Sequence, residues 1–119
     1  MDKLVNKIVA LGVPGLVLLI AMHLTGFAGA AALTAALASL GGPLGMLGGL
    51  AVLGILSLIA NGLSKYGFEA IYDKVIYRLK TEQNLTEEEI IEKIWSYPIS
   101  RSMKYRLIGK IREQSMSVA

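Results

Sequence analysis

Three side chains in the apolar N-terminal half of the chain are the candidates there for chemistry. His23 is the sole ionisable group between Ile8 and Ser64, since this stretch contains no Asp, Glu, Lys or Arg. An imidazole near the end of an apolar helix could gate a pore or relay a proton, although a lone histidine there is more often an interfacial residue bonded to water or a carbonyl. Ser57 and Asn61 lie one helical turn apart and could line a polar seam. Hydrogen bonding between helices, without a transport role, is the simpler explanation for this pair.

The sequence lacks the combinations of residue types that catalysis or metal binding requires. The chain contains one histidine and no cysteine, and it has no carboxylate between Ile8 and Ser64. Nucleophile–base pairs, metal clusters and paired acids therefore have no residues from which to assemble. The glycine-rich segments do not lead into Gly-Lys-Ser or Gly-Lys-Thr, as a phosphate-binding loop would. We expect neither an enzyme nor a bound cofactor or metal.

The distribution of charge predicts a membrane protein. The chain is 54% hydrophobic, and of its 12 Lys and Arg residues all but Lys3 and Lys7 follow Ser64. A charge at the centre of a bilayer costs about 2.5–3.5 kcal/mol, which explains a long uncharged stretch. The alternatives are a buried core helix and a soluble carrier of apolar ligands. The start of the chain resembles a signal peptide, but its apolar stretch is longer than a signal core, so we expect it to be retained.

The apolar half, residues 1–64, is predicted to be the transmembrane domain, and a first glycine-containing break divides it. A helix is expected over residues 4–24, kinked by Pro14, which removes one backbone donor. Thr25-Gly26 then separates this helix from an alanine-rich segment over residues 27–40. At about 21 Å, a helix of that length is too short to cross a bilayer upright.

A second break, Gly41-Gly42-Pro43, precedes a helix predicted over residues 44–63, which at about 30 Å matches one hydrocarbon thickness. Basic residues at both ends of the apolar half favour cytoplasmic termini and an even number of crossings. We therefore predict an all-α helical hairpin with two spans in the cell inner membrane, with residues 27–40 as a re-entrant or interfacial helix. Three spans with the tail outside are the alternative.

The charged C-terminal part is predicted to form an amphipathic exit helix over residues 65–81 and a cytoplasmic helical hairpin over residues 82–119. Lys65-Tyr66-Gly67-Phe68 supplies the cation and aromatics typical of a membrane exit. Thr86 and Glu89 have capping-box spacing, and Ser100 can cap a last helix after Tyr97-Pro98. The apolar residues expected in the hairpin core are Ile90, Ile94, Trp95, Leu107 and Ile111. Such a hairpin is too small to bury a good core alone, so we expect it to pack on something, which could be a separate sensor or regulator protein.

Basic residues are interspersed along the last predicted helix, over residues 101–112. Interspersed on a short helix after a membrane domain, they fit acidic lipid headgroups or the acidic arm at residues 87–92 better than nucleic acid.

Small residues recur at a spacing of four, which is typical of closely packed membrane helices. In lipid no hydrophobic force drives helices together, so close approach of backbones at small residues supplies the packing. The candidate packing residues are Ala28, Ala32, Ala36, Gly41, Gly45, Gly48 and Gly49. They could serve a homo-oligomer or only the internal packing of one chain.

Residues 8–80 resemble small bacterial membrane proteins built on a Gly/Ala-rich hydrophobic hairpin followed by a short charged tail. The features that carry the resemblance are Ala30-Ala31-Ala32, Gly41-Gly42-Pro43-Leu44-Gly45-Met46 and Tyr66-Gly67-Phe68-Glu69. Such proteins often act as membrane-permeabilising toxins, holin-like pores or effectors of antiviral, anti-phage defence. The resemblance and the small-residue spacing together predict a self-assembling protein that forms or gates a pore. A passive membrane anchor or adaptor that presents the tail as a docking module is the alternative.

Overall fold

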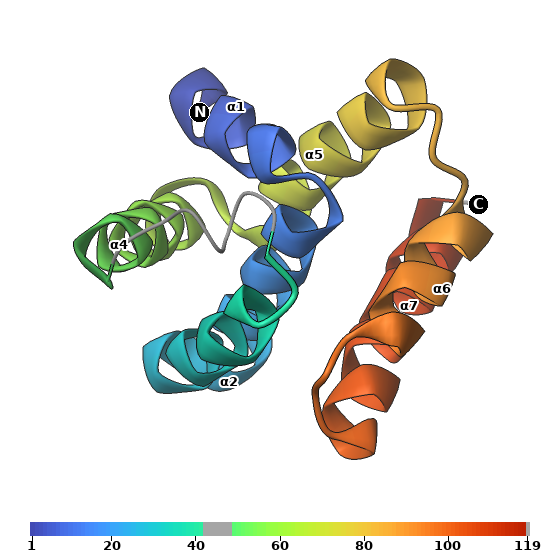
Figure 1. The fold of residues 1–119 in the computed structure, drawn as a ribbon. Helices are drawn as coiled ribbons and strands as arrows, with labels where there is room; N and C mark the ends of the chain where they lie inside the picture. Colours follow the sequence, from blue (N-terminus) through green and yellow to red (C-terminus); the bar gives the residue numbers. More distant parts are fainter. Residues whose placement is uncertain (42–48, 119) are drawn as a thin grey trace.

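Six helices and no strand form the part of the chain that the computed structural model describes, which is residues 1–41 and 49–118. Side chains are described for all of these except residues 49–52 and 117–118. The helices are α1 (Asp2–Leu11), α2 (Val13–Ala38), α4 (Gly49–Tyr66), α5 (Phe68–Glu82), α6 (Glu87–Ser96) and α7 (Arg101–Val118). The all-α prediction is confirmed. Figure 1 shows α4 and the α6–α7 pair on opposite sides of the bundle, with α2 between them.

The helix predicted over residues 4–24 is in fact two helices. Gly12 ends α1 with a φ of 77°, and its N–H donates a hydrogen bond to the carbonyl of Val9. Pro14 then lies in the first turn of α2, where backbone N–H groups have no acceptor within the helix. The proline therefore costs no hydrogen bond there, and it starts a helix and does not kink one. Separated in this way, α1 is amphipathic: Leu4, Val5, Ile8, Val9 and Leu11 are buried, whereas Asp2, Lys3, Asn6 and Lys7 are exposed.

A kink in α2 lies at the first predicted break. Gly26 has φ 80° and ψ −171°, a conformation that a glycine adopts at little cost, and helix resumes directly after it and runs to Ala38. Before the kink, the hydroxyl of Thr25 donates to the carbonyl of Ala21 at 2.8 Å. Two helical halves of α2, residues 13–25 and 27–38, therefore run in different directions.

The second half of the chain continues from α4 through Gly67, whose φ of 86° turns the chain into α5. The described part of α4 extends three residues beyond the predicted end at residue 63. The amphipathic helix expected over residues 65–81 begins later, at Phe68, because Lys65 and Tyr66 belong to α4 and Gly67 forms the turn. The second predicted break, at residues 41–43, and the start of the predicted 44–63 helix lie largely outside the described residues.

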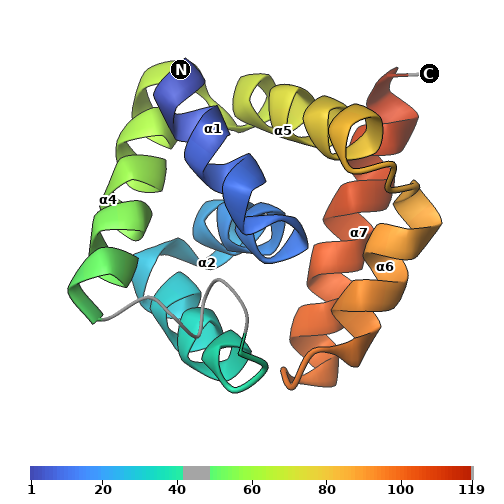
Figure 2. The ribbon, with the colours of Figure 1, turned by 45° about the horizontal axis from the view of Figure 1, so that its top comes forward.

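The first half of α2 forms the centre of the molecule. Each side chain from Leu16 to Ala21 is at most 1% exposed, so every face of this helix is covered. Figure 2 looks along this segment and shows α1, α4, α5 and the α6–α7 pair arranged around it. Because these six residues are all apolar, burial on every side leaves no polar side chain without a partner.

One helix among the described residues, α2, is long and apolar enough to cross a membrane. An 18-residue window in it has a mean hydropathy of 2.0, and half of that window is buried inside the structure. The core helix of a water-soluble bundle can have this composition too. The two-span arrangement stays a prediction, since the second span includes residues outside the description.

Both helices of the C-terminal hairpin begin at the caps that the sequence predicts. The N–H of Glu89 donates to the hydroxyl oxygen of Thr86 at 3.1 Å, and the N–H of Thr86 donates to a carboxylate oxygen of Glu89 at 3.2 Å. At the start of α7 the N–H of Met103 donates to the hydroxyl oxygen of Ser100 at 3.2 Å. These bonds satisfy backbone donors that a helix start leaves free.

Candidate membrane interface

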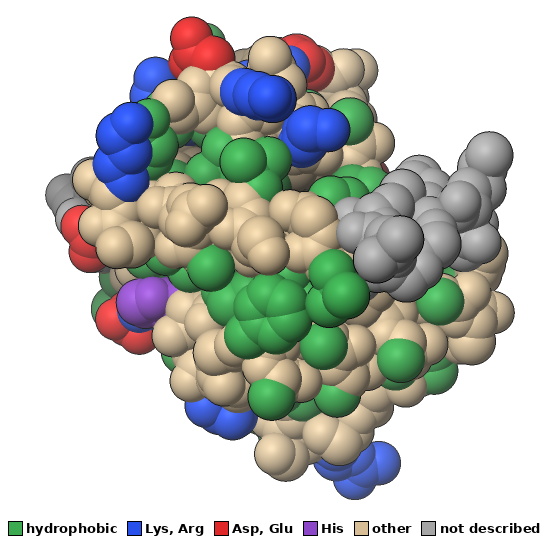
Figure 3. Space-filling view, turned by 90° about the vertical axis from the view of Figure 1, so that its left-hand side faces the viewer, with side chains coloured by type: hydrophobic (Ala, Val, Ile, Leu, Met, Phe, Trp, Pro, Cys, Tyr) green, Lys and Arg blue, Asp and Glu red, His purple; other side chains and the backbone are tan. Residues whose placement is uncertain are grey.

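An uncharged face is the most distinctive surface of the molecule. It is formed by the second half of α2 and by α4, and neither segment carries an Asp, Glu, Lys or Arg before Lys65. Three large apolar side chains are exposed on these segments and on the turn after α2: Phe27, Leu40 and Leu53. Figure 3 shows this side, where apolar side chains are spread across the middle and charged ones gather toward the edges. A surface of this kind suits contact with lipid or with another protein.

The predicted alanine stripe lies partly on this face and partly in a groove. Ala28 and Ala32 are exposed, and Ala36 is half-buried. Ala32 and Ala36 line a groove of about 310 Å³ whose opposite wall is the loop and first turn of the α6–α7 hairpin, at Pro98, Ile99, Ser100 and Met103. Ala32 and Ala36 therefore face the hairpin tip, whereas Ala28 lies outside this groove.

The glycine run cannot be compared with the alanine stripe in full. Gly45 and Gly48 lie outside the described residues, and the side of α4 that Gly49 faces is not described either. Gly41 is exposed, with a φ of 76°, in the turn after α2. Packing through these glycines stays a prediction.

His23 lies where three helices meet. Its imidazole stacks on the ring of Phe68 in α5, with centroids 4.1 Å apart and planes 11° apart. The ammonium of Lys110 in α7 lies 5.3 Å from the centre of the same Phe68 ring. Ser57 and Asn61 are exposed on α4, and Asn61 lines a pocket between α1 and α4. The histidine and the predicted polar seam are therefore in different surroundings.

Four of the five residues expected in the hairpin core are buried. Ile90, Ile94, Leu107 and Ile111 are each at most 1% exposed.

The prediction for Trp95 is wrong, because its side chain is 42% exposed. One residue beyond the buried Ile94, it is turned about 100° away around the helix. Its ring meets Tyr105 edge to face, with centroids 5.4 Å apart, and the ammonium of Lys104 lies 5.6 Å from its centroid. The pair forms a small aromatic surface on the outside of the hairpin.

Tyr97 is a buried hairpin residue that the predicted hairpin core does not include. It was interpreted only as part of a helix stop, yet it is 7% exposed and shares a pocket with residues of the α1–α2 junction, among them Gly12 and Pro14. Burial raises the pKa of the Tyr97 phenol to about 12. An aromatic at a helix end, next to a proline, was the available signal. Through this residue the hairpin contacts the rest of the bundle.

The predicted attraction between the acidic and basic arms of the hairpin is not observed among the described residues. Their two ion pairs both form within a single helix: Arg78 with Glu82 at 2.6 Å and Lys110 with Glu113 at 3.4 Å. The seam between α6 and α7 is apolar. Of the basic side chains of α7, Lys104 donates to the carbonyl of Trp95 at 2.8 Å and Lys110 is half-buried, whereas the arginines Arg101, Arg106 and Arg112 are exposed.

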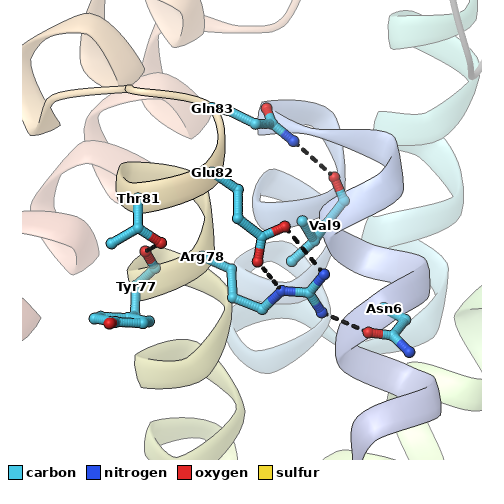
Figure 4. Close-up of polar contacts among 7 residues, drawn as sticks. All are labelled: Asn6, Val9, Tyr77, Arg78, Thr81, Glu82 and Gln83. Carbon is cyan, nitrogen blue, oxygen red and sulfur yellow. Dashed lines mark hydrogen bonds and ion pairs between the residues drawn. The ribbon is translucent and has the colours of Figure 1, made fainter.

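Polar contacts fasten α1 to the end of α5 (Figure 4). The side-chain amide of Gln83 donates to the carbonyl of Val9 at 3.1 Å, and the guanidinium of Arg78 donates to the side-chain oxygen of Asn6. The hydrogen bond from Arg78 lowers the pKa of the Glu82 carboxyl and holds that guanidinium in place. These contacts orient the amphipathic α1 across the bundle.

Comparison with known protein families, curated proteins and solved structures found no match. The class of protein is therefore defined by its own features. It is an all-helical bundle around one apolar helix, with an uncharged face formed by α4 and the second half of α2.

Proposed function

We propose that this protein is a small self-assembling membrane protein that forms or gates a pore, as membrane-permeabilising effectors and toxins do. The observation that carries the proposal is the uncharged face of α2 and α4, with Phe27, Leu40 and Leu53 exposed. Soluble monomers rarely leave an extended apolar surface without a use. Lipid accepts such a face with no desolvation of charge.

The kink in α2 divides it into two halves, and each half is too short to cross a bilayer. Each half of α2 covers about 20 Å, less than the hydrocarbon thickness of about 30 Å, whereas all 26 residues in a straight helix would cover about 39 Å. Straightening at Gly26 would make α2 long enough to cross with a tilt. We propose that α2 and α4 are the two spans, with both termini on the cytoplasmic side and the amphipathic α1 and α5 at the interface.

A small exposed residue supplies the contact for assembly. Ala28, which lies outside the groove at the hairpin tip, allows another helix to approach closely, and repeated contacts of this kind can close copies into a ring. A pore wall without charges would gate by hydrophobic constriction.

Dye release from lipid vesicles tests the proposal, combined with crosslinking in the same membranes. The parent protein should release dye and form crosslinked oligomers. Ala28→Leu should still bind vesicles, since Leu is favourable in lipid, but should lose most crosslinking and dye release. Ala70→Leu is the matched control, because Ala70 is exposed on α5, outside the uncharged face. A parent protein that binds vesicles without ever releasing dye would refute the pore.

That result would favour the second candidate function, a membrane anchor or adaptor that presents the hairpin to a separate sensor or regulator protein. The exposed Trp95–Tyr105 pair supports this candidate. Such aromatics are enriched in protein interfaces, where their large surface provides much of the binding energy.

A further inference from the structure

A pocket of about 210 Å³ lies between the start of α1 and the end of α4, and its lining combines cations with apolar side chains. Leu4, Leu58 and Gly62 provide the apolar wall, whereas Lys3 and Lys65 provide the charge. The two lysines are far apart in the sequence and are brought to one place because α1 packs against α4. In Figure 2 the start of α1 lies directly beside the end of α4.

The pocket is electropositive. Among the residues that the structure describes, neither Lys3 nor Lys65 forms an ion pair with a carboxylate. Asp2, the neighbour of Lys3, lines a different pocket together with Lys74 and Arg78, between α1 and α5.

The side chain of Tyr66 lies at the same pocket. The amino group of Met1 donates to the Tyr66 hydroxyl oxygen at 3.0 Å, and the ammonium of Lys65 lies 5.3 Å from the Tyr66 ring centre. An anion in the pocket would be stabilised by the neighbouring ammonium groups.

The pocket also lies at the border of the uncharged face. Lys65 and Tyr66 are the last two residues of α4, which is one of the two segments that form this face. Lys65 is the basic residue of α4. Lysine and tyrosine at the end of an apolar helix are the residues that reach the headgroup level of a bilayer. A phosphate at that level would meet the two ammonium groups while its acyl chains extend along the apolar face.

We propose that this pocket binds the phosphate of an anionic phospholipid headgroup, through Lys3 and Lys65, with the glycerol and first acyl carbons against Leu4 and Leu58. The proposal rests on the membrane location proposed above and specifies the lipid class that it uses. It does not depend on pore formation.

Binding to vesicles of phosphatidylcholine alone, and of phosphatidylcholine and phosphatidylglycerol in equal parts, tests the site. A basic residue close to an anionic membrane contributes about fivefold in binding, so the double variant Lys3→Gln/Lys65→Gln should lose roughly 25-fold on the anionic vesicles. On phosphatidylcholine alone its binding should match that of the parent. Circular dichroism should show unchanged helix content.

The matched control is Arg106→Gln/Arg112→Gln, which removes the same charge from exposed positions on α7. Figures 1 and 2 both place α7 on the side of the bundle opposite α4. This variant should lose less than about twofold. Equal losses in both double variants would mean that net charge alone attracts the protein, and would overturn the site.

Soluble glycerol phosphate separates a lipid headgroup from a free phosphate. It should bind weakly, without a difference between the parent and Lys3→Gln/Lys65→Gln, since it lacks the acyl chains that use the apolar wall. Tight binding that needs both lysines, without any preference for anionic vesicles, would overturn the lipid assignment. Dye release is a separate measurement: a parent that binds anionic vesicles but never releases dye refutes the pore and leaves the lipid site standing.

Discussion

The first half of α2 and the α6–α7 hairpin are built in opposite ways. Between Leu16 and Ala21 every side chain is apolar and buried, so no polar group specifies how this segment is oriented. The hairpin begins each helix at a side-chain cap, buries a single apolar stripe and exposes its charges.

This difference separates two sources of stability within a small chain. In the hairpin, side-chain caps fix where each helix begins, and one apolar stripe fixes which face is buried, so both follow from local residues. The α2 segment is held by burial alone, and burial against protein can be exchanged for burial against lipid at little cost. The same apolar helix can therefore suit a bundle and a bilayer, whereas the charged hairpin suits only the water side.

The largest effect should come from truncation inside α2. Leu19→Ala removes most of a fully buried side chain and should lower the free energy of unfolding by about 3 kcal/mol. Leu53→Ala, at a side chain that is 46% exposed on the uncharged face, should cost less than about 1 kcal/mol. Chemical unfolding followed by circular dichroism measures both. Equal costs would show that α2 is not the centre of the fold and would break the comparison.

A second test concerns how closely α1 approaches α2. A Cβ on Gly15 would collide with the backbone carbonyl of Ile8, so Gly15→Ala must push the two helices apart and should cost about 1–3 kcal/mol. Gly54→Ala is the control, because a Cβ on Gly54 meets nothing within 4 Å. There the gain in helix propensity should raise stability by up to about 1 kcal/mol. If Gly15→Ala is as stable as the parent, α1 is not packed so tightly.

A smaller effect is expected from the caps of the hairpin. Thr86→Ala removes the capping box and should cost about 1 kcal/mol, with faster amide exchange confined to the first turn of α6. Thr81→Ala, which removes a hydroxyl bonded within its own helix to the carbonyl of Tyr77, should cost less than about 0.5 kcal/mol. Loss of exchange protection throughout the bundle in Thr86→Ala would contradict the local definition of the hairpin.

The smallest effect at neutral pH should come from Tyr97, where the two regions meet. Burial raises the pKa of this phenol from 10.0 to about 12, so the neutral form stabilises the fold below pH 10 and this contribution is lost as the pH rises through 12. Tyr97→Phe should change stability by less than about 1 kcal/mol at neutral pH and should lose less than the parent between pH 10 and 12. A residual loss is expected from Tyr72, whose pKa burial also raises.

Tyr105→Phe is the control for removal of a phenol hydroxyl, because the Tyr105 side chain is exposed on the outside of the hairpin. Loss of this exposed hydroxyl should leave the unfolding midpoints close to those of the parent. If Tyr97→Phe also follows the parent, the phenol does not hold the hairpin against the α1–α2 junction.

Sequence reasoning was most successful where the signal is local. The cap at Thr86 and the cap at Ser100 depend on residues within one turn, and the stripe of Ile90, Ile94 and Leu107 follows from helical periodicity. Trp95 was misplaced because its size and apolar character suggested a core residue, whereas its position next to Ile94 turns it outward.

In the apolar half, periodicity carries no information because nearly every residue is apolar. The sequence predicted that Pro14 kinks one long helix, and only the structure shows that Gly12 ends α1 and that the proline starts α2. The pocket at Lys3 and Lys65 was equally hidden, since residues so far apart meet only through tertiary packing.

The sequence by itself determined the helical class, the uncharged stretch from Ile8 to Ser64 and the caps of the C-terminal helices. These follow from residue type and from contacts within a turn. Only the tertiary structure decided which apolar helix lies at the centre, which small residues stay exposed and which cations share a pocket. The hydrophobic effect is non-directional. An apolar sequence therefore predicts that a helix is buried, but it does not specify which other helices cover it.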